Sequence, residues 1–145
     1  MERITIIEFT IEGKAEPQGR PRAVRMGAGV RMYDPPKSKA YKQVVSLKGR
    51  SYMARNHLEP YTEPLKVTLE FYFKPPKSYS KKRLKAIENL EEFFIKKPDI
   101  DNLVKCVTDG LNGIAYLDDA LIVELVAKKQ YADSDYTKVI IEPVR

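Results

Sequence analysis

The sequence predicts a single α/β (α+β) domain in which helices flank a small mixed β-sheet. Segments whose apolar residues alternate with period two are interspersed with segments of helical periodicity, in the order β-loop-α-β-α-α-β-β. The 145 residues match the length of one domain, and 43% hydrophobic and 32% charged residues are close to the averages of globular proteins. Because no repeat or linker divides the chain, we expect residues 1–145 to form one domain.

The first half of the chain predicts a strand, a loop and a helix. Residues 3–11 alternate along a mostly apolar run that ends at Gly13, which predicts a mostly buried strand. Residues 17–29 are rich in Gly, Pro and Arg and have no apolar period, so we expect an exposed, mobile loop. Residues 38–57 place apolar side chains at helical spacing and predict a helix, which Gly49 weakens at its middle.

The clearest strand of the sequence is residues 65–73, where apolar and polar side chains alternate without a break. Ser80 then occupies an N-cap position before residues 81–92, whose spacing predicts a short basic amphipathic helix. Residues 102–112 carry an apolar stripe that predicts another helix, and Gly113 supplies its C-terminal stop.

The end of the chain predicts two strands. Residues 121–131 and 136–144 are β-branched and apolar, which favours extended structure. The polar residues 132–135 between them are typical of a hairpin turn. We therefore expect the last two strands to form a β-hairpin.

The charge of the chain is unevenly distributed. The formal net charge is +6 and the isoelectric point about 9.3. Residues 14–55 hold eleven basic residues against two acidic ones, whereas residues 99–145 are net acidic. A polyanionic partner is the natural interpretation of this pattern, and a solvated basic face is the alternative.

Several classes of protein are excluded. No apolar run approaches the roughly 18 residues of a membrane span, and the first residues do not resemble a signal peptide, so we expect a cytoplasmic protein without membrane contact. Cys106 is the single cysteine and His57 the single histidine, which excludes an internal disulfide and a four-ligand zinc site built from them. Any bound metal is therefore held by oxygen ligands.

Carboxylates gather around the helix of residues 102–112. Asp99 and Asp101 project from the same side if their backbone is extended, and two nearby carboxylates often bind Mg²⁺ or Mn²⁺. Lys105 follows Asp101 by one helical turn, and Asp118 and Asp119 follow the helix.

Each of these features also has a structural explanation. Asp101 or Asn102 can cap the helix, while Asp99 favours its positive end. Lys105 can form an ordinary ion pair with Asp101 or Asp109. The acidic pair at residues 118–119 can belong to a turn before a strand.

The whole pattern resembles a known signature. The run D-I-D-N-L-V-K at residues 99–105, followed by D-G-L at 109–111 and Y-L-D-D-A at 116–120, resembles the signature of RusA-type Holliday junction resolvases. Residues 19–22 and 33–41 are similar to the N-terminal part of many members, so the resemblance covers nearly the whole chain. The chain differs from shorter members by a longer Arg-rich loop and a longer insert before the acidic motif.

The resemblance implies a RusA-like fold and a homodimeric, Mg²⁺-dependent endodeoxyribonuclease of bacterial or phage origin. Such an enzyme introduces paired symmetric nicks into four-way DNA junctions in recombination and repair, with Mn²⁺ as a substitute metal. By position, the metal ligands are Asp99, Asp101 and Asp119, with Asp118 as a further candidate. The catalytic residues are the same three carboxylates together with Lys105, the essential cation.

A basic flank beside an acidic site suits a DNA substrate, because carboxylates repel the phosphates that Lys and Arg must hold. The expected DNA contacts are basic residues of the loop and the following helix: Arg20, Arg22, Arg25, Arg31, Lys37 and Lys39. Tyr33 and Tyr41 could stack on unpaired bases, although the helical spacing of Tyr41 favours the core. The alternatives are a nuclease for flaps or forks, a non-catalytic DNA-binding module, or a family member that has lost its activity.

Overall fold

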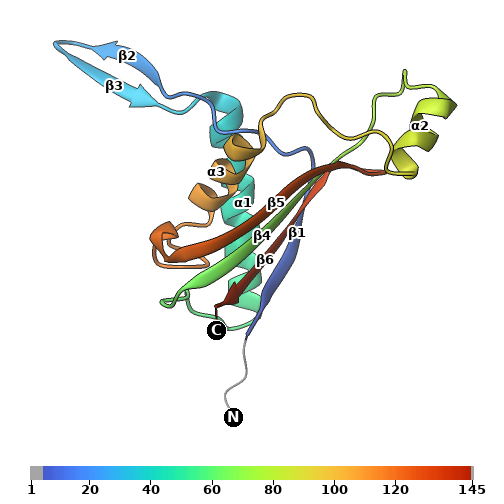
Figure 1. Cartoon of the computed structure of the whole chain (residues 1–145). Coiled ribbons are helices and arrows are strands. Elements are labelled where there is room, and N and C mark those ends of the chain that lie inside the picture. The colour runs from blue at the N-terminus through green and yellow to red at the C-terminus, as the bar shows by residue number, and fades with distance from the viewer. Residues whose placement is uncertain (1–4, 145) are drawn as a thin grey trace.

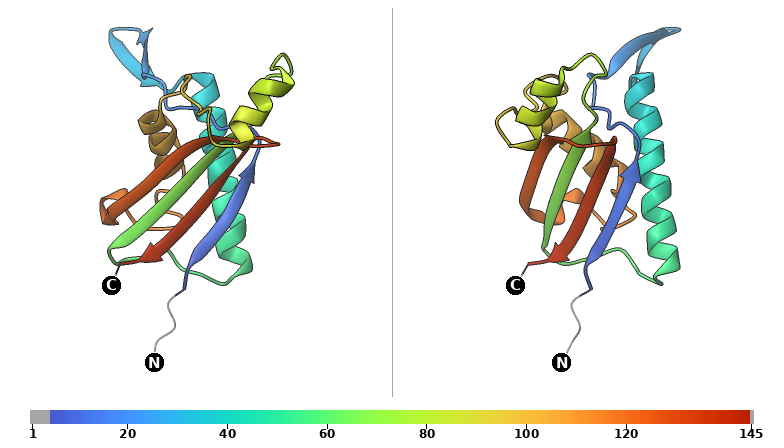
Figure 2. Two further views of the ribbon diagram at one scale, coloured as in Figure 1. Left: turned by 45° about the vertical axis from the view of Figure 1, so that its right-hand side comes forward. Right: turned by 90° about the vertical axis from the view of Figure 1, so that its right-hand side faces the viewer.

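The computed structural model describes residues 5–144 (Figure 1). A four-stranded mixed sheet has the order β1-β6-β4-β5, and a second sheet consists of β2 and β3 alone. Helices α1 and α3 lie on one face of the large sheet, while α2 stands beyond one end of it (Figures 1 and 2). The mixed α+β class predicted from the sequence is confirmed. Among residues 5–144, no helix has the length and apolarity that a membrane crossing needs.

Strand β4 (Leu65–Phe73) lies in the middle of the large sheet and is the strand predicted most clearly. Its odd-numbered residues are buried under the helices, and its even-numbered residues are partly exposed on the other face. It pairs antiparallel with β6 (Tyr136–Pro143) and parallel with β5 (Ile122–Tyr131). This strict alternation is the reason why the sequence places the strand correctly.

Strand β1 (Ile7–Glu12) forms one edge of the sheet by pairing antiparallel with β6. The sequence predicts its start at residue 3, but residues 1–4 lie outside the described residues and Ile6 is 47% exposed. Ile7 and Ile11 are fully buried, whereas alternate residues are exposed. The prediction of a mostly buried strand is therefore correct for one face only.

The predicted hairpin between the last two strands is wrong, because β4 lies between β5 and β6. The connection crosses the end of β4 and is attached there. Ala132 donates its N–H to the carbonyl of Phe73 (2.9 Å), and the Asp135 carboxylate accepts the N–H of Lys74 (2.8 Å). Residues 132–135 do connect β5 to β6, as the polar pattern predicts. A local turn pattern, however, cannot predict that a third strand lies between the two connected strands.

The three predicted helices are present. Helix α1 (Pro36–Arg55) and helix α3 (Ile100–Gly110) each begin two residues before the predicted position. Helix α2 (Lys81–Glu88) ends four residues early, and the Ser80 hydroxyl accepts the N–H of Arg83 (3.2 Å) as its predicted cap.

The core lies between the sheet and the crossing of α1 over α3. Tyr41 and Cys106 are buried in it, and burial raises the pKa of the Cys106 thiol to about 11. Gly49, which weakens α1 in isolation, lies where α1 passes close to the residues that follow α3. A Cβ at this position would lie 2.6 Å from Leu111 Cδ2. The close approach of the two helices explains a glycine that helix propensity disfavours.

The Arg-rich segment is not the predicted loop. It forms an antiparallel hairpin of β2 (Arg22–Met26) and β3 (Gly29–Tyr33), with Gly27 at positive φ (+59°) in the two-residue turn. A glycine at the first turn position is typical of a type II′ turn. The hairpin extends away from the large sheet (Figure 1), and all its residues are exposed. Because neither face is buried, the sequence carries no apolar period that would predict strands.

Candidate active site

Helix α3 carries two of the four candidate catalytic residues, Asp101 and Lys105, and a third, Asp99, is its N-cap. Its apolar stripe, which includes Leu103 and Val107, is buried, so the other side of the helix faces solvent. Asp101 lies in the first turn and Lys105 one turn later, and both are exposed. The predicted placement of these two residues along one exposed side of a helix is confirmed.

Asp99 is the N-cap of α3 and has an extended backbone (φ −71°, ψ 142°). Asp99 and Asp101 were expected to project from one side if residues 99–101 were extended. This condition is not met, since the helix already begins at Ile100. The Asp99 side chain makes no capping hydrogen bond and instead pairs with Lys97 (Nζ to Oδ1, 2.7 Å). This leaves a half-exposed carboxylate at the positive end of the helix.

The second acidic segment returns toward α3 after the helix ends. Asp119 begins a single 3₁₀ turn, η1 (Asp119–Leu121), and its N–H donates to Asn112 Oδ1 just beyond α3 (2.9 Å). Asp118 caps this turn by accepting the N–H of Ala120 (3.1 Å). The turn interpretation is thus correct for Asp118, and the same turn leaves Asp119 exposed near the helix.

The two carboxylates influence each other. A hydrogen bond with Asp118 raises the pKa of Asp119, and desolvation and the nearby Asp109 charge act in the same direction. The pKa of Asp118 is lowered, first by the Ala120 N–H and then by Asp119. The positive charge of Lys105 lowers the pKa of Asp119. Asp119 is therefore close enough to Lys105 and Asp109 to sense their charges.

An ion-pair network supports Lys105. The Lys105 ammonium lies 3.4 Å from Asp109 Oδ2, and Lys42 lies 3.7 Å from the same oxygen. Lys42 also pairs with Asp34 (2.9 Å), so the chain Asp34, Lys42, Asp109, Lys105 joins α1 to α3. Lys105 thus pairs with Asp109, one of its two predicted partners. Asp109 and Lys42 were not predicted as site residues. Two sequence signals pointed to Asp109: its position one turn after Lys105, and its place at the start of the D-G-L part of the signature.

Replacing Asp34 by Asn tests this network through its pH dependence. The hydrogen bond from Lys42 holds the pKa of the Asp34 carboxyl below its ordinary value of 3.8. A lowered pKa in the folded state stabilises the protein above pH 3.8, and the contribution is lost as the pH falls through the folded-state pKa. We expect Asp34→Asn to lower the free energy of unfolding by about 0.5 to 1 kcal/mol at pH 7.

Urea unfolding at pH 7 and at pH 3 measures this difference. It should shrink at pH 3, because protonation of the wild-type carboxyl removes the same charge as the pH falls from 3.8 toward the lowered pKa of Asp34. Asp133→Asn, at an exposed residue of the connection between β5 and β6, is the control and should change neither value. An Asp34→Asn difference of equal size at both pH values contradicts the role of the ion pair.

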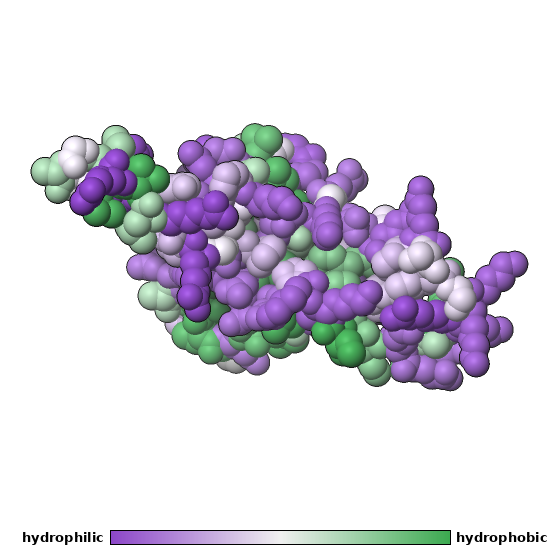
Figure 3. All heavy atoms as spheres, turned by 90° about the horizontal axis from the view of Figure 1, so that it is seen from above, coloured by the Kyte–Doolittle hydropathy of each residue, from purple (hydrophilic) through white to green (hydrophobic). Residues whose placement is uncertain are grey.

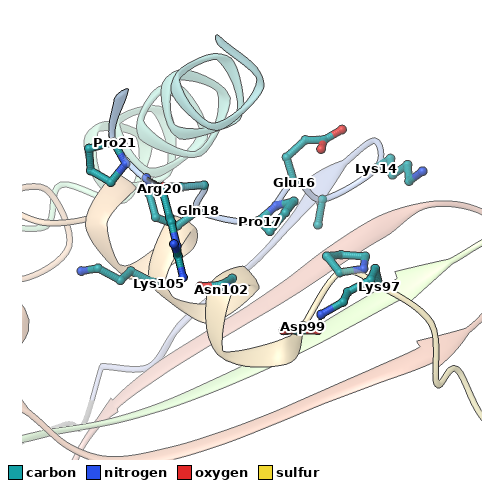
Figure 4. Close-up of a pocket in the computed structure, with 13 residues that line it drawn as sticks. Lys14, Glu16, Pro17, Gln18, Arg20, Pro21, Lys97, Asp99, Asn102 and Lys105 are labelled. Atoms are coloured by element: carbon teal, nitrogen blue, oxygen red, sulfur yellow. Dashed lines mark hydrogen bonds and ion pairs between the residues drawn. The ribbon is translucent and has the colours of Figure 1, made fainter. Parts of the chain in front are cut away.

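A groove of about 790 Å³ runs along the start of α3 (Figure 4). Its walls are residues 14–21 and 97–98 together with Asp99, Asn102 and Lys105. The backbone N–H of Gln18 donates to the Asn102 carbonyl (2.8 Å), which holds the first wall against the helix. The groove therefore contains catalytic candidates and basic residues of the N-terminal segment in one place.

The candidate DNA contacts divide into three groups. Arg20 lines the groove at the same end as Lys105 (Figure 4). Three are exposed on the β2–β3 hairpin: Arg22, Arg25 and Arg31. Lys37 and Lys39 are exposed in the first turn of α1. The groove also contains Lys14 and Lys97, which were not predicted as contacts.

The donor set around α3 fits a hard metal ion only in part. Over residues 5–144, no three His, Cys, Asp or Glu side chains come together as a metal-binding group. Asp101, Asp118 and Asp119 also lie outside the lining of the groove. Mg²⁺, however, commonly binds through one or two carboxylates, with waters and substrate phosphates completing its shell. The exposed carboxyls of the adjacent residues 118 and 119 offer oxygen donors of this kind.

Comparison with known proteins gives two matches. The family model described as Endodeoxyribonuclease RusA matches residues 12–142. The uncharacterized protein YqaN of Bacillus subtilis (strain 168) is 36% identical over 141 residues, which cover 95% of this chain and 96% of that protein. The family match includes the groove, the hairpin and every candidate carboxylate.

Proposed function

The chain belongs to the RusA family of endodeoxyribonucleases, and we propose that it resolves Holliday junctions by Mg²⁺-dependent, paired symmetric nicks. The observation that carries this proposal is the groove along α3, whose lining includes the exposed Asp99 and Lys105 together with Arg20. Phosphodiester cleavage needs carboxylates for a metal and cations for the phosphate, and these types of residue meet here.

Electrostatics supports DNA as the substrate. The chain has a net charge of +6, and the segment that forms the first wall of the groove continues into the Arg-rich hairpin. Cations of the groove, such as Lys14, Arg20 and Lys97, can neutralise phosphates close to the acidic residues. We infer that these residues hold the DNA backbone while the carboxylates stay accessible to a metal.

In the mechanism that we propose, Asp99, Asp101 and Asp119 would hold Mg²⁺, with Asp118 as a further candidate ligand, and Mn²⁺ could substitute. Such an ion would supply an activated water for in-line attack and would neutralise charge on the leaving oxygen. Lys105 donates to an oxygen of the scissile phosphate, where charge increases in the transition state. Its side chain is 61% exposed and reaches this position when it exchanges Asp109 for the phosphate.

A symmetric four-way junction presents two equivalent strands for cutting. A two-fold homodimer with one site per subunit matches this symmetry, and we propose this assembly. The enzyme would act in recombination and repair wherever bacterial or phage DNA is exposed, that is, in the cytoplasm.

The test is cleavage of a labelled four-way junction, a flap, a fork and a linear duplex, each with Mg²⁺, Mn²⁺ or EDTA. We expect the junction to be cut in symmetric pairs, with either metal and not with EDTA. Faster cutting of the flap or the fork would identify the nuclease for other branched DNA. Tight junction binding without cutting in any metal would favour the non-catalytic DNA-binding module.

The hairpin arginines predict the salt dependence of binding. Each lost phosphate contact lowers the slope of log K against log salt by about one. We expect Arg25→Ala/Arg31→Ala to lower the slope by about two for junction and duplex alike. Arg55→Ala is the matched control, because Arg55 ends α1 far from the hairpin (Figure 1). If the salt-dependence slope is the same for the wild type and the double variant, the hairpin arginines do not contact DNA phosphates.

A further inference from the structure

The β2–β3 hairpin exposes apolar side chains that no core explains. Val30 is 68% exposed, Met32 58% and Met26 57%. We call these three residues the apolar tip: Met26 precedes the two-residue turn, Val30 lies on β3 shortly after it, and Met32 follows opposite Ala23, on the same face as Val30. Apolar side chains grouped on an exposed element mark an interaction surface more often than chance exposure does.

Arginine and apolar side chains are interleaved on both faces of the hairpin. Arg25 lies directly opposite Val30, and Arg31 directly opposite Val24. Directly opposite side chains in an antiparallel pair are near neighbours on one face. In Figure 3 the hairpin at the left therefore shows hydrophilic and hydrophobic spheres side by side.

This composition favours nucleic acid as the partner. Residues 17–33 contain four arginines and no acidic residue. Guanidinium groups bind phosphates, while apolar side chains fit between bases that have lost their stacking partners. The hairpin is also continuous with the groove, because Arg20 lines the groove and Arg22 begins β2.

The base of the hairpin is fixed to α1, and the residues just before it are attached to α3 through the Gln18 N–H and the Asn102 carbonyl. The buried Ser38 hydroxyl accepts the N–H of Gly19 (2.9 Å) and donates to the Pro17 carbonyl (2.9 Å). A Cβ at Gly19 would lie 2.8 Å from Pro35 Cγ, so the two arms pass close together. On the other arm, Asp34 pairs with Lys42 of α1. The tip is thereby held in a defined position relative to α3.

We propose that the apolar tip inserts between bases at the branch point of DNA and selects branched DNA over continuous duplex. This inference rests on the proposed nuclease function, since it concerns how the substrate of that site is recognised. A branch point has already lost part of its stacking, so insertion there costs less than insertion into a regular duplex. Tyr33, 40% exposed and opposite Arg22, can support a displaced base by stacking.

The experiment places 2-aminopurine beside the branch point of a four-way junction and at the centre of a duplex, in EDTA so that no strand is cut. Wild-type protein should raise the junction fluorescence several-fold and leave the duplex signal unchanged. Met26→Ser/Val30→Ser/Met32→Ser should abolish the rise. Its preference for junction over duplex should fall about tenfold, with duplex affinity kept within about twofold.

Two further variants separate packing from charge. Val30→Ile/Met32→Leu keeps the tip apolar and should keep the fluorescence rise, whereas the unchanged duplex affinity of the triple Ser variant excludes a general loss of its hairpin structure. Arg25→Ala/Arg31→Ala should weaken binding to junction and duplex equally. A full fluorescence rise with the triple Ser variant overturns the inference. Vesicles of phosphatidylglycerol that bind wild type but not the triple Ser variant, while the junction response stays intact, overturn it in favour of a lipid surface.

The same experiments distinguish a failure of the nuclease proposal from a failure of the hairpin inference. If no junction is cut with Mg²⁺ but the fluorescence rise depends on the apolar tip, the catalytic assignment fails and recognition by the hairpin stands. If the junction is cut normally and the fluorescence rise does not depend on the tip, the hairpin inference fails alone.

Discussion

The Asp101→Asn protein should bind a four-way junction as tightly as the wild type and cut it about a thousandfold more slowly. The amide has nearly the shape of the carboxylate but lacks the charge that a divalent cation requires. Asp101 is exposed in the first turn of α3, and its side chain is not part of the core. The loss should therefore fall on catalysis and not on folding, and single-turnover cleavage in Mg²⁺ measures it.

Asp119→Asn should behave in the same way, because Asp119 is another of the carboxylates proposed to hold the metal and is also exposed. Asp133→Asn is the control of equal charge change and should cut at the wild-type rate. Binding is measured in EDTA, where removal of a carboxylate lowers repulsion of the phosphates and should not weaken the complex. Cleavage by Asp101→Asn at more than a tenth of the wild-type rate would falsify its role as a metal ligand.

Gly110→Val should lower the free energy of unfolding by about 3 kcal/mol. A Cβ at Gly110 would lie 2.9 Å from Val45 Cγ1 and 3.3 Å from the carbonyl oxygen of Lys42. A backbone oxygen and a branched side chain in the core cannot give way, so α1 and α3 must separate. The Ser46 hydroxyl would lose its hydrogen bond to the Gly110 carbonyl (2.6 Å) as well.

Urea unfolding with Gly29→Ala as the control tests this prediction. Gly29 lies in the exposed hairpin, and the nearest atom to its added Cβ is 3.8 Å away. We expect the control to stay within about 0.5 kcal/mol of the wild type. An unchanged midpoint for Gly110→Val would mean that the helix crossing is loosely packed. The separation of the helices should also weaken the Lys42–Asp109 contact and slow cleavage.

Elements with a local signal were predicted correctly from the sequence. Strand β4 alternates because one face is buried, and Ser80 caps α2 because its hydroxyl reaches an N–H three residues later. The stripe of α3 follows from its burial on one side. In each case the pattern repeats or is completed within a few residues of the chain, so it can be read from the sequence.

Elements that depend on distant partners were not predicted. The separation of β5 from β6 depends on β4, more than fifty residues earlier in the chain. Gly49 is a poor helix residue until Leu111 lies against it. The β2–β3 hairpin was missed for a different reason, since its two exposed faces impose no alternation on the sequence.

The candidate site also combines features that the sequence predicts with features that depend on the folded structure. The types of residue and their spacing along α3 are properties of the chain, so the amino-acid sequence was sufficient to identify Asp99, Asp101 and Lys105 as candidates and to indicate a polyanionic partner. The placement of Asp119 near Lys105, the link from Asp34 through Lys42 to Asp109, and the groove between residues 14–21 and α3 required the folded chain. These contacts join segments far apart in sequence, and their energies depend on distances that are set when α1 and α3 pack on the sheet.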